Sequence, residues 1–207
     1  LPSIVLGGAE VWDPGKEIII AFPISEEARI AVASLIIDQS EKIKLARFHP
    51  TGSRQLVFYA STDEIETKFR GIYAKTHGLE KMFRDINEFS RALTTAQVSA
   101  ILIRTNNDTT LDIPPALRDL VEVDDSIKGE VTITQRGVTK ASTLLWVCNY
   151  LRVSPDKVLT AGDSDKTDAP VFAHTHGISV GETTIPNAKE SVKSIDELAS
   201  LLEKRYT

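Results

Sequence analysis

The chain has 207 residues, of which 42% are hydrophobic and 26% charged, with a formal net charge of -5. This length allows one large α/β domain or two smaller ones around an ordinary hydrophobic core. No apolar stretch approaches the roughly 20 residues that a membrane-spanning helix needs, and the scattered basic residues exclude a strongly basic nucleic-acid surface. We therefore expect neither a membrane nor a nucleic acid among the partners.

A single cysteine, Cys148, excludes an internal disulfide. It lies in an apolar helical pattern, where a cysteine is expected to serve as a small core residue. This cysteine usage fits a reducing compartment, so we expect a cytoplasmic protein.

The chain begins at Leu1, and its only methionine is Met82. A translation product begins with Met, and leucine is a poor second residue for removal of that Met. We therefore expect a processed, truncated or partial polypeptide, with removal of the initiator Met alone as the alternative.

The first two thirds of the chain predict strands that pair with neighbouring strands, with helices between them. Residues 4–6 form a buried apolar strand, and a hairpin follows around Pro14-Gly15. Ser25 begins an amphipathic helix that runs to about Gln39. The further predicted elements are strands at 44–48 and 55–59, helices after Thr62 and at 87–93, a strand at 98–104, a helix at 117–120, and strands at 121–124 and 131–134. This order is typical of an α+β domain.

From residue 139 the chain alternates helices and strands in short units. The predicted order is helix 139–151, strand 158–161, helix 169–174, strand 178–180 and helix 195–205. This alternation of helices and strands is typical of βαβ units in a parallel sheet. The sequence therefore predicts an α/β fold, with a parallel-sheet domain at 1–8 and 129–207 and an inserted α+β domain at 9–128. The hinges are expected near Gly8 and Gly129.

The predicted strand at 158–161 ends in a glycine and three closely spaced carboxylates, Asp163, Asp165 and Asp168. In an open α/β sheet, ligands bind beyond the carboxyl ends of the strands. Three like charges repel one another unless solvent or a hard cation such as Mg²⁺ lies among them. The alternative is that Asp163 or Ser164 simply caps the following helix.

Lys140 lies in the first turn of an otherwise apolar helix. A lysine there opposes the helix dipole and costs a few tenths of a kcal/mol unless an anion lies nearby. The free N–H groups of a first turn and an ammonium together can bind a phosphate or a carboxylate. The alternative is an exposed lysine that extends into water, but its combination with the acidic strand end favours an anion site.

Two segments resemble motifs three and four of the haloacid dehalogenase superfamily. They are Gly137-Val138-Thr139-Lys140-Ala141 and Gly162-Asp163-Ser164-Asp165-Lys166-Thr167-Asp168. The closest resemblance is to its cap-bearing sugar-phosphate phosphatases. Within these, the C-terminal segments look like the sucrose-, trehalose- and mannosylglycerate-phosphate phosphatases: Gly177-Ile178-Ser179-Val180-Gly181, Asn187-Ala188-Lys189, Val192-Lys193-Ser194 and Leu198.

The resemblance implies a Rossmann-like core, incomplete at its N-terminus, with an inserted α+β cap, and a small phosphorylated molecule as substrate. It implies that Lys140 neutralises the transferring phosphate and the attacking carboxylate. Asp163 would bind Mg²⁺ directly, and Asp168 would hold the metal or its waters. Ser164 is a further candidate with a helping role, whereas Asp165 falls at a position that the family leaves free.

The sequence departs from the family pattern at the nucleophile. Family members have two aspartates around one residue, followed by threonine; the first attacks the phosphorus and the second is the general acid. The nearest segments, Asn107-Asp108-Thr109-Thr110 and Asp124-Asp125-Ser126, lack this spacing. The Ser or Thr of the second family motif is also missing, and both motifs are expected upstream of Leu1.

Three functional interpretations remain open on the sequence. The first is Mg²⁺-dependent hydrolysis of a sugar phosphate through an aspartyl-phosphate. The second is a phosphate- and metal-binding module without a nucleophile, and the third is a phosphoryl shuttle like the phosphomannomutases. Four side chains of the inserted domain could meet a sugar or a phosphate, although we expect ordinary surface charges: Arg47, His49, Arg54 and Arg104.

Overall fold

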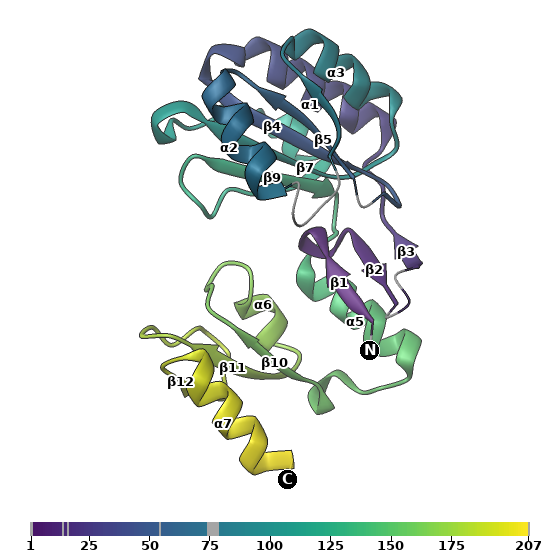
Figure 1. Ribbon diagram of the computed structural model, residues 1–207. Helices are drawn as coiled ribbons and strands as arrows, with labels where there is room; N and C mark the ends of the chain where they lie inside the picture. The colour runs from purple at the N-terminus through teal and green to yellow at the C-terminus, as the bar shows by residue number, and fades with distance from the viewer. Residues whose placement is uncertain (1, 14, 16, 54, 74–78, 207) are drawn as a thin grey trace. The chain divides into compact units, whose positions relative to one another are not determined.

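The computed structural model describes all residues except 1, 14, 16, 54, 74–78 and 207 (Figure 1). The backbone forms two compact units, Leu1–Thr139 and Lys140–Thr207. Each unit has its own sheet structure. None of the helices in the described part of the chain combines the length and the apolar character that crossing a bilayer requires.

The first unit begins with a small antiparallel sheet of β1 (Ser3–Val5), β2 (Glu10–Trp12) and β3 (Ile18–Ala21), in that order. The pairing of β2 with β3 confirms the predicted hairpin around Pro14-Gly15. Leu6 and the two glycines that follow have positive φ, which turns the chain sharply between β1 and β2. The first strand is only half-buried, because it packs within this small sheet rather than in a large core.

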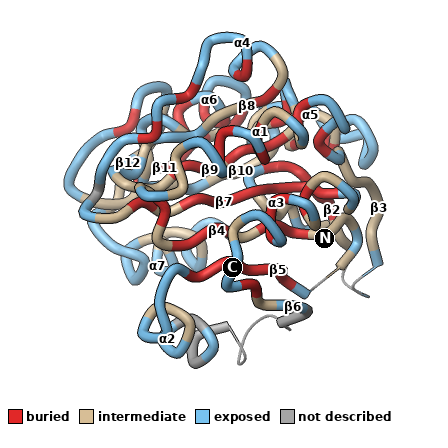
Figure 2. Tube along the Cα trace, turned by 90° about the horizontal axis from the view of Figure 1, so that it is seen from above, coloured by how far each residue is buried: buried red, intermediate tan, exposed pale blue. Residues whose placement is uncertain are grey.

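The larger sheet of the first unit has six strands in the order β6-β5-β4-β7-β9-β8. All neighbouring pairs are antiparallel except β5 and β6, which are parallel. The strands are β4 (Ile43–Pro50), β5 (Leu56–Ala60), β6 (Leu79–Phe83), β7 (Val98–Thr105), β8 (Val121–Asp124) and β9 (Glu130–Gln135). Figure 2 shows buried residues running along β4, β5 and β7, the central part of this sheet.

Helices cover the two faces of the six-stranded sheet unequally (Figure 1). The helices are α1 (Glu26–Asp38), α2 (Asp63–Tyr73), α3 (Ile86–Thr95) and α4 (Pro115–Arg118). Phe89 of α3 is fully buried and packs with Ile101 of β7 in the main core. The next residue of that strand, Leu102, packs with Ile65 of α2 in a smaller cluster. Because successive strand residues point to opposite faces, α2 lies on the face opposite α3.

The predicted helix caps of the first unit are present. The Ser25 hydroxyl accepts a hydrogen bond from the Ala28 backbone N–H at 3.3 Å. The Thr62 hydroxyl accepts one from the Ile65 backbone N–H, also at 3.3 Å. These side chains satisfy N–H groups that a helix start leaves without a backbone partner.

A buried carboxylate joins the small sheet to the large one. Glu10 of β2 is 1% exposed, and its Oε2 accepts a hydrogen bond from Trp12 Nε1 at 2.7 Å. Its Oε1 accepts from the Ser99 hydroxyl of β7 at 2.6 Å and from the Gly52 backbone N–H at 3.2 Å. A carboxylate buried in this way costs free energy unless its oxygens are hydrogen-bonded, which these three donors achieve.

The second unit has a three-stranded sheet in the order β10-β11-β12, with all strands parallel. Its elements are α5 (Lys140–Leu151), β10 (Leu159–Gly162), α6 (Ala169–Phe172), β11 (His176–Val180), β12 (Glu190–Val192) and α7 (Ile195–Tyr206). The parallel pairing confirms the predicted fold class of the C-terminal part. On α5, the rings of Trp146 and Tyr150 stack, with centroids 5.3 Å apart.

Two glycines let the elements of the second unit approach closely. A Cβ on Gly177 of β11 would lie 2.3 Å from Cγ of Phe172, the buried last residue of α6. Gly162 plays a similar part beside the site described below. Neither position has the left-handed φ that favours glycine, so the requirement is steric.

The predicted domain boundaries, with hinges near Gly8 and Gly129, stay a prediction. The strand β9, predicted with the parallel-sheet domain, pairs with β7 and β8 in the six-stranded sheet. The prediction that His49 is a surface charge is wrong, because His49 is buried. Arg104 forms an ion pair with Glu130 at 2.5 Å, and Arg54 lies outside the described residues.

Candidate active site

The loop between β10 and α6 carries the predicted acidic residues. Asp163 follows the last residue of β10, and Asp168 immediately precedes α6. The backbone N–H of Asp168 donates to the Ser164 carbonyl at 3.0 Å, which closes the loop into a turn. The end of a parallel strand thus presents this loop where ligands of open α/β sheets bind.

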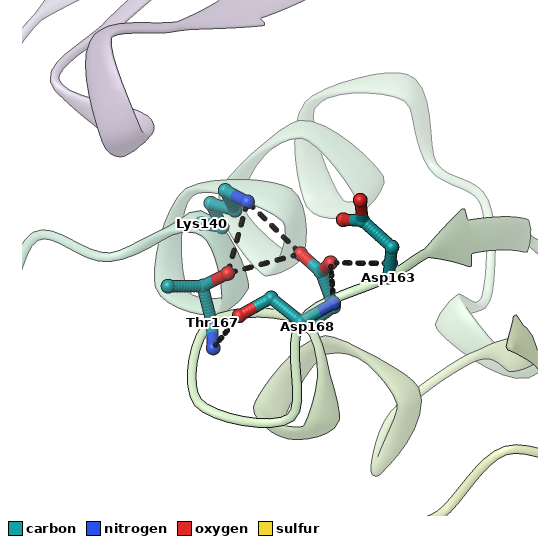
Figure 3. A network of polar contacts seen from close by, with 5 residues as sticks. Lys140, Asp163, Thr167 and Asp168 are labelled. Atoms are coloured by element: carbon teal, nitrogen blue, oxygen red, sulfur yellow. Dashed lines mark hydrogen bonds and ion pairs between the residues drawn. The ribbon is translucent and has the colours of Figure 1, made fainter. Parts of the chain in front are cut away.

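Asp168 is the central residue of the loop, and Figure 3 shows its contacts. Its Oδ1 accepts a hydrogen bond from Lys140 Nζ at 2.9 Å. Its Oδ2 accepts from the backbone N–H groups of Asp163 and Ser164, both at 3.1 Å. Since only 9% of Asp168 is exposed, these contacts hold its carboxylate in one position.

The environment of Asp168 favours its ionised form. Burial raises the pKa of this carboxyl, but the Lys140 ammonium and the backbone N–H groups of Ser164 and Asp163 outweigh that effect. The pKa of Asp168 therefore lies below its ordinary value. Asp168 consequently presents a negative charge to Lys140 at neutral pH.

Gly162 makes this arrangement sterically possible. A Cβ at this position would lie 2.3 Å from Asp168 Oδ2 and 2.5 Å from its Cγ. Any side chain would therefore displace the carboxylate that orients Lys140. The glycine that ends β10 is part of the geometry of the site.

Lys140 begins α5, as predicted, and its side chain is 47% exposed. Its ammonium pairs with Asp168 and also donates to the Thr167 hydroxyl at 3.2 Å. The negative charge of Asp168 offsets the unfavourable position of a lysine at a helix start. The structure thus brings together Lys140 and Asp168, which lie at opposite ends of the segment that contains α5, β10 and the loop after β10.

Asp163 differs from Asp168 in its surroundings. Its side chain is exposed, and in Figure 3 its backbone N–H, not its carboxylate, is joined to Asp168 by a dashed line. Carboxylate oxygens are ligands that Mg²⁺ prefers, and Mg²⁺ commonly binds through one or two carboxylates together with waters and substrate phosphate. Asp163 therefore fits a direct ligand, whereas the occupied oxygens of Asp168 suit contact with the waters of a metal.

The described residues hold no cluster of three or more His, Cys, Asp or Glu side chains that could bind a metal by themselves. A Mg²⁺ site at Asp163 would thus need additional oxygen ligands, which waters and a substrate phosphate supply in many such sites. The donor set fits Mg²⁺ better than Zn²⁺, because neither a cysteine nor a histidine joins it.

Ser164 organises the loop rather than facing a ligand. Its hydroxyl accepts a hydrogen bond from the Thr167 backbone N–H at 3.3 Å. Thr167 has no role among the sequence predictions, although it contacts Lys140 directly. Its position next to Asp168 is the only feature of the sequence that could have indicated this contact.

The segments nearest to the family nucleophile motif lie in the first unit. Asp124 accepts a hydrogen bond from the Ser126 backbone N–H at 3.0 Å, and Asp125 pairs with Arg118 at 3.1 Å. Both carboxylates thus have contacts with nearby residues of the first unit, one in the same loop and one at the end of α4. These contacts give neither carboxylate the surroundings expected of a nucleophile.

Comparisons with known proteins give a family match. Residues 1–198 match the family of haloacid dehalogenase-like hydrolases. The comparison with curated proteins gives no match.

Among solved structures, one protein from Eubacterium rectale has a TM-score of 0.77 at 20% identity, with 99% of this chain and 77% of that chain covered. BT1666 from Bacteroides thetaiotaomicron, a phosphatase of the haloalkanoate superfamily, has a TM-score of 0.72 at 17% identity, with 98% and 73% covered. BT4131, a sugar phosphatase of subclass IIB, has a TM-score of 0.71 at 14% identity, with 99% and 75% covered. These likenesses establish a shared fold.

Proposed function

Since this chain belongs to the haloacid dehalogenase-like hydrolases, we propose that the complete protein is a Mg²⁺-dependent phosphatase that acts on a sugar phosphate. The observation that carries the proposal is the 2.9 Å contact between Lys140 and Asp168 beside the exposed carboxylate of Asp163. An oriented cation next to a hard-metal ligand is what phosphoryl transfer requires, because that reaction depends mainly on positioning and neutralisation of charge.

In this proposal Lys140 neutralises the transferring phosphoryl group, and Asp168 holds the Lys140 ammonium in place. Asp163 would bind a Mg²⁺ ion directly, and Asp168 would contact its waters. When bound, Mg²⁺ would offset negative charge on the phosphoryl oxygens. Ser164 supports both aspartates by fixing the turn between them.

The attacking group is proposed to be an aspartate outside these 207 residues. The two-aspartate motif of the family does not occur in the sequence, and the chain covers about three quarters of the solved relatives. Among the residues that the structure describes, one edge of β10 has no strand partner within its sheet. A parallel strand paired along that edge would bring its carboxyl end beside Asp163, where an attacking carboxylate is needed.

The proposed reaction has two steps. The aspartate carboxylate attacks the phosphorus, the bond from phosphorus to the sugar oxygen breaks, and that oxygen takes a proton from a general acid. Water then attacks the phosphorus of the aspartyl-phosphate and gives a proton back to the deprotonated general acid; the bond from phosphorus to the aspartate oxygen breaks, which releases inorganic phosphate and restores the carboxylate. Both the nucleophile and the acid come from the same two-aspartate motif in the family that this chain resembles.

A sugar phosphate is the proposed substrate class because BT4131 is a sugar phosphatase of the same fold, and because the C-terminal segments look like those of disaccharide-phosphate phosphatases. A cytoplasmic location is proposed as well, since Cys148 is a free, buried thiol. Burial raises the pKa of this thiol, so it stays protonated rather than acting as a nucleophile.

The test is phosphate release by the complete polypeptide with Mg²⁺ and a panel of sugar phosphates. We expect turnover that Lys140→Ala lowers by on the order of 100-fold or more, since a lost transition-state cation contact costs at least that much. Release no greater than that of Lys140→Ala with every sugar phosphate would overturn the proposal.

The same assay separates the two alternatives. A phosphoryl shuttle would require a hexose bisphosphate and would move phosphate between positions of the sugar instead of releasing it. A binding module would gain thermal stability from phosphate or Mg²⁺ without turnover. Turnover without a bisphosphate contradicts both.

A further inference from the structure

Thr167 contacts the Lys140 ammonium, and the proposed function leaves it without a role. We propose that Thr167 is a positioning residue whose hydroxyl, together with Asp168, fixes the Lys140 ammonium for contact with a phosphoryl oxygen. This inference rests on the proposed function for its chemistry, but its geometry is independent of the substrate.

A single ion pair does not fix a lysine side chain. The ammonium sits on a flexible four-carbon stem and has three rotatable donors. The contact to Asp168 Oδ1 at 2.9 Å leaves the ammonium free to rotate about that bond. A second contact, to Thr167 Oγ1 at 3.2 Å, removes this freedom. Figure 3 shows the ammonium held between the two oxygens.

The Thr167 hydroxyl can make both hydrogen bonds that hold the Lys140 ammonium beside Asp168. A hydroxyl can donate one hydrogen bond and accept two. That of Thr167 accepts from Lys140 and donates to Asp168 Oδ1 at 3.4 Å. The three groups thus form a closed triangle of hydrogen bonds, in which the two opposite charges face each other.

The backbone fixes Thr167 itself. Its N–H donates to the Ser164 hydroxyl at 3.3 Å, and the turn closes through the Asp168 N–H and the Ser164 carbonyl at 3.0 Å. The hydroxyl therefore occupies a set position relative to α5. The ammonium keeps a third N–H donor, for which the described part of the chain supplies no acceptor. That donor is the one left for a phosphoryl oxygen.

The test compares Thr167→Val with Thr167→Ser in the complete protein. Valine keeps the shape and loses the hydroxyl, whereas serine keeps the hydroxyl. The first measurement is the affinity for inorganic phosphate without Mg²⁺, by calorimetry. We expect Thr167→Val to weaken binding on the order of 10-fold, since a hydrogen bond to a charged group is lost, and Thr167→Ser to stay within about 3-fold of the wild type.

A second measurement separates positioning from damage to the loop. The Mg²⁺ concentration for half-maximal activity should be unchanged in Thr167→Val, because Asp163 and the Asp168 backbone contacts remain, while kcat falls on the order of 10-fold. Asp165→Asn, an exposed change in the same loop, serves as the control and should match the wild type in both measurements.

Two outcomes would overturn the inference. Wild-type phosphate affinity in Thr167→Val would show that the hydroxyl does not hold Lys140. Equal losses in the valine and serine variants, accompanied by weaker Mg²⁺ dependence, would show a folding role of the loop. Because phosphate binding is measured directly, the comparison of the valine and serine variants in that assay can be read even if no sugar phosphate is hydrolysed. That failure would concern the proposed function alone.

Discussion

Asp168 uses both of its carboxylate oxygens for contacts within the second unit. One oxygen orients Lys140, and the other accepts two backbone N–H groups from the start of the loop. A substitution at this residue would therefore release the lysine and loosen the turn together. More informative substitutions change the surroundings of Asp168 and leave its carboxylate intact.

Gly162→Ala is such a substitution. The added Cβ would lie 2.3 Å from Asp168 Oδ2, so the carboxylate must move, and a displacement near 1 Å can cost on the order of 100-fold in rate. We expect kcat/KM of the complete protein to fall by that order on its best sugar phosphate, with the fold intact by circular dichroism.

Gly15→Ala is the matched control for this change. Its Cβ would meet only the side chain of Asp13 at 3.4 Å, and Gly15 has no left-handed φ. Activity close to that of the wild type is expected. If Gly162→Ala were equally active, close approach at Gly162 would not be what positions Asp168.

Residue types and spacing predict that Lys140 and the acidic end of the strand belong to one site, because a lysine at a helix start is unfavourable without an anion nearby. They do not predict which carboxylate contacts the lysine. The role of Thr167 could not be predicted in this way. It depends on a turn closed by Ser164, and a threonine next to an aspartate is common in loops. The roles of Asp163 and Asp168 toward a metal stay predictions.

At the scale of elements, the Glu10 side chain connects β2 by hydrogen bonds to β7 and to the turn after β4. Replacing it by alanine would leave Trp12 Nε1, the Ser99 hydroxyl and the Gly52 N–H without their shared acceptor. We expect Glu10→Ala to lower the free energy of unfolding by about 2–4 kcal/mol, because buried polar groups lose their partner.

Urea denaturation followed by circular dichroism measures this effect. Glu27→Ala, at an exposed position of α1, is the control and should change stability by no more than about 0.5 kcal/mol. Equal stability of Glu10→Ala and Glu27→Ala would contradict a joining role for the buried carboxylate.

The sequence predicted most elements but missed two strands. β6 contains Glu80 and Lys81 between its apolar residues, and β12 is only three residues long and begins with Glu190. Both lie at the edge of their sheets, where burial is one-sided and the apolar pattern is weak. The short helix α6 ends at Phe172, two residues before the predicted end.

At the scale of the whole molecule, the strand order of the six-stranded sheet could not be predicted. Its central pairing joins β4 to β7 across two helices and two other strands, and hydrophobic period alone does not specify such distant partners. The parallel sheet of the second unit was predictable, because alternating short helices and strands allow few other arrangements.

Acid should destabilise the protein as a whole. Five carboxyl groups have pKa values below their ordinary range: Glu66, Asp85, Asp156, Asp168 and Glu190. A carboxyl group whose pKa is lower in the folded state stabilises the fold above its unfolded pKa, and this contribution is lost as the pH falls through the folded value. We expect Tm to decline as the pH falls below about 4, the ordinary range of carboxyl groups.

Arg205→Gln tests the contribution of one carboxyl group. The Arg205 guanidinium, bonded to both Glu190 oxygens at 2.8 Å, is the main cause of the lowered pKa of Glu190, and His176 contributes as well. The variant should lose less Tm than the wild type between pH 5 and pH 3. An unchanged or steeper acid decline would contradict this assignment.

The protein has two tryptophans, and each compact unit contains one of them. Trp12 donates to the buried Glu10 in the first unit, and Trp146 stacks on Tyr150 in the second. Their indole rings thus have different neighbours, one a carboxylate and the other an aromatic ring. Replacing either by phenylalanine leaves a single tryptophan, whose emission on selective excitation reports the unfolding of one unit. The two units can therefore be followed separately in one polypeptide, without an attached dye.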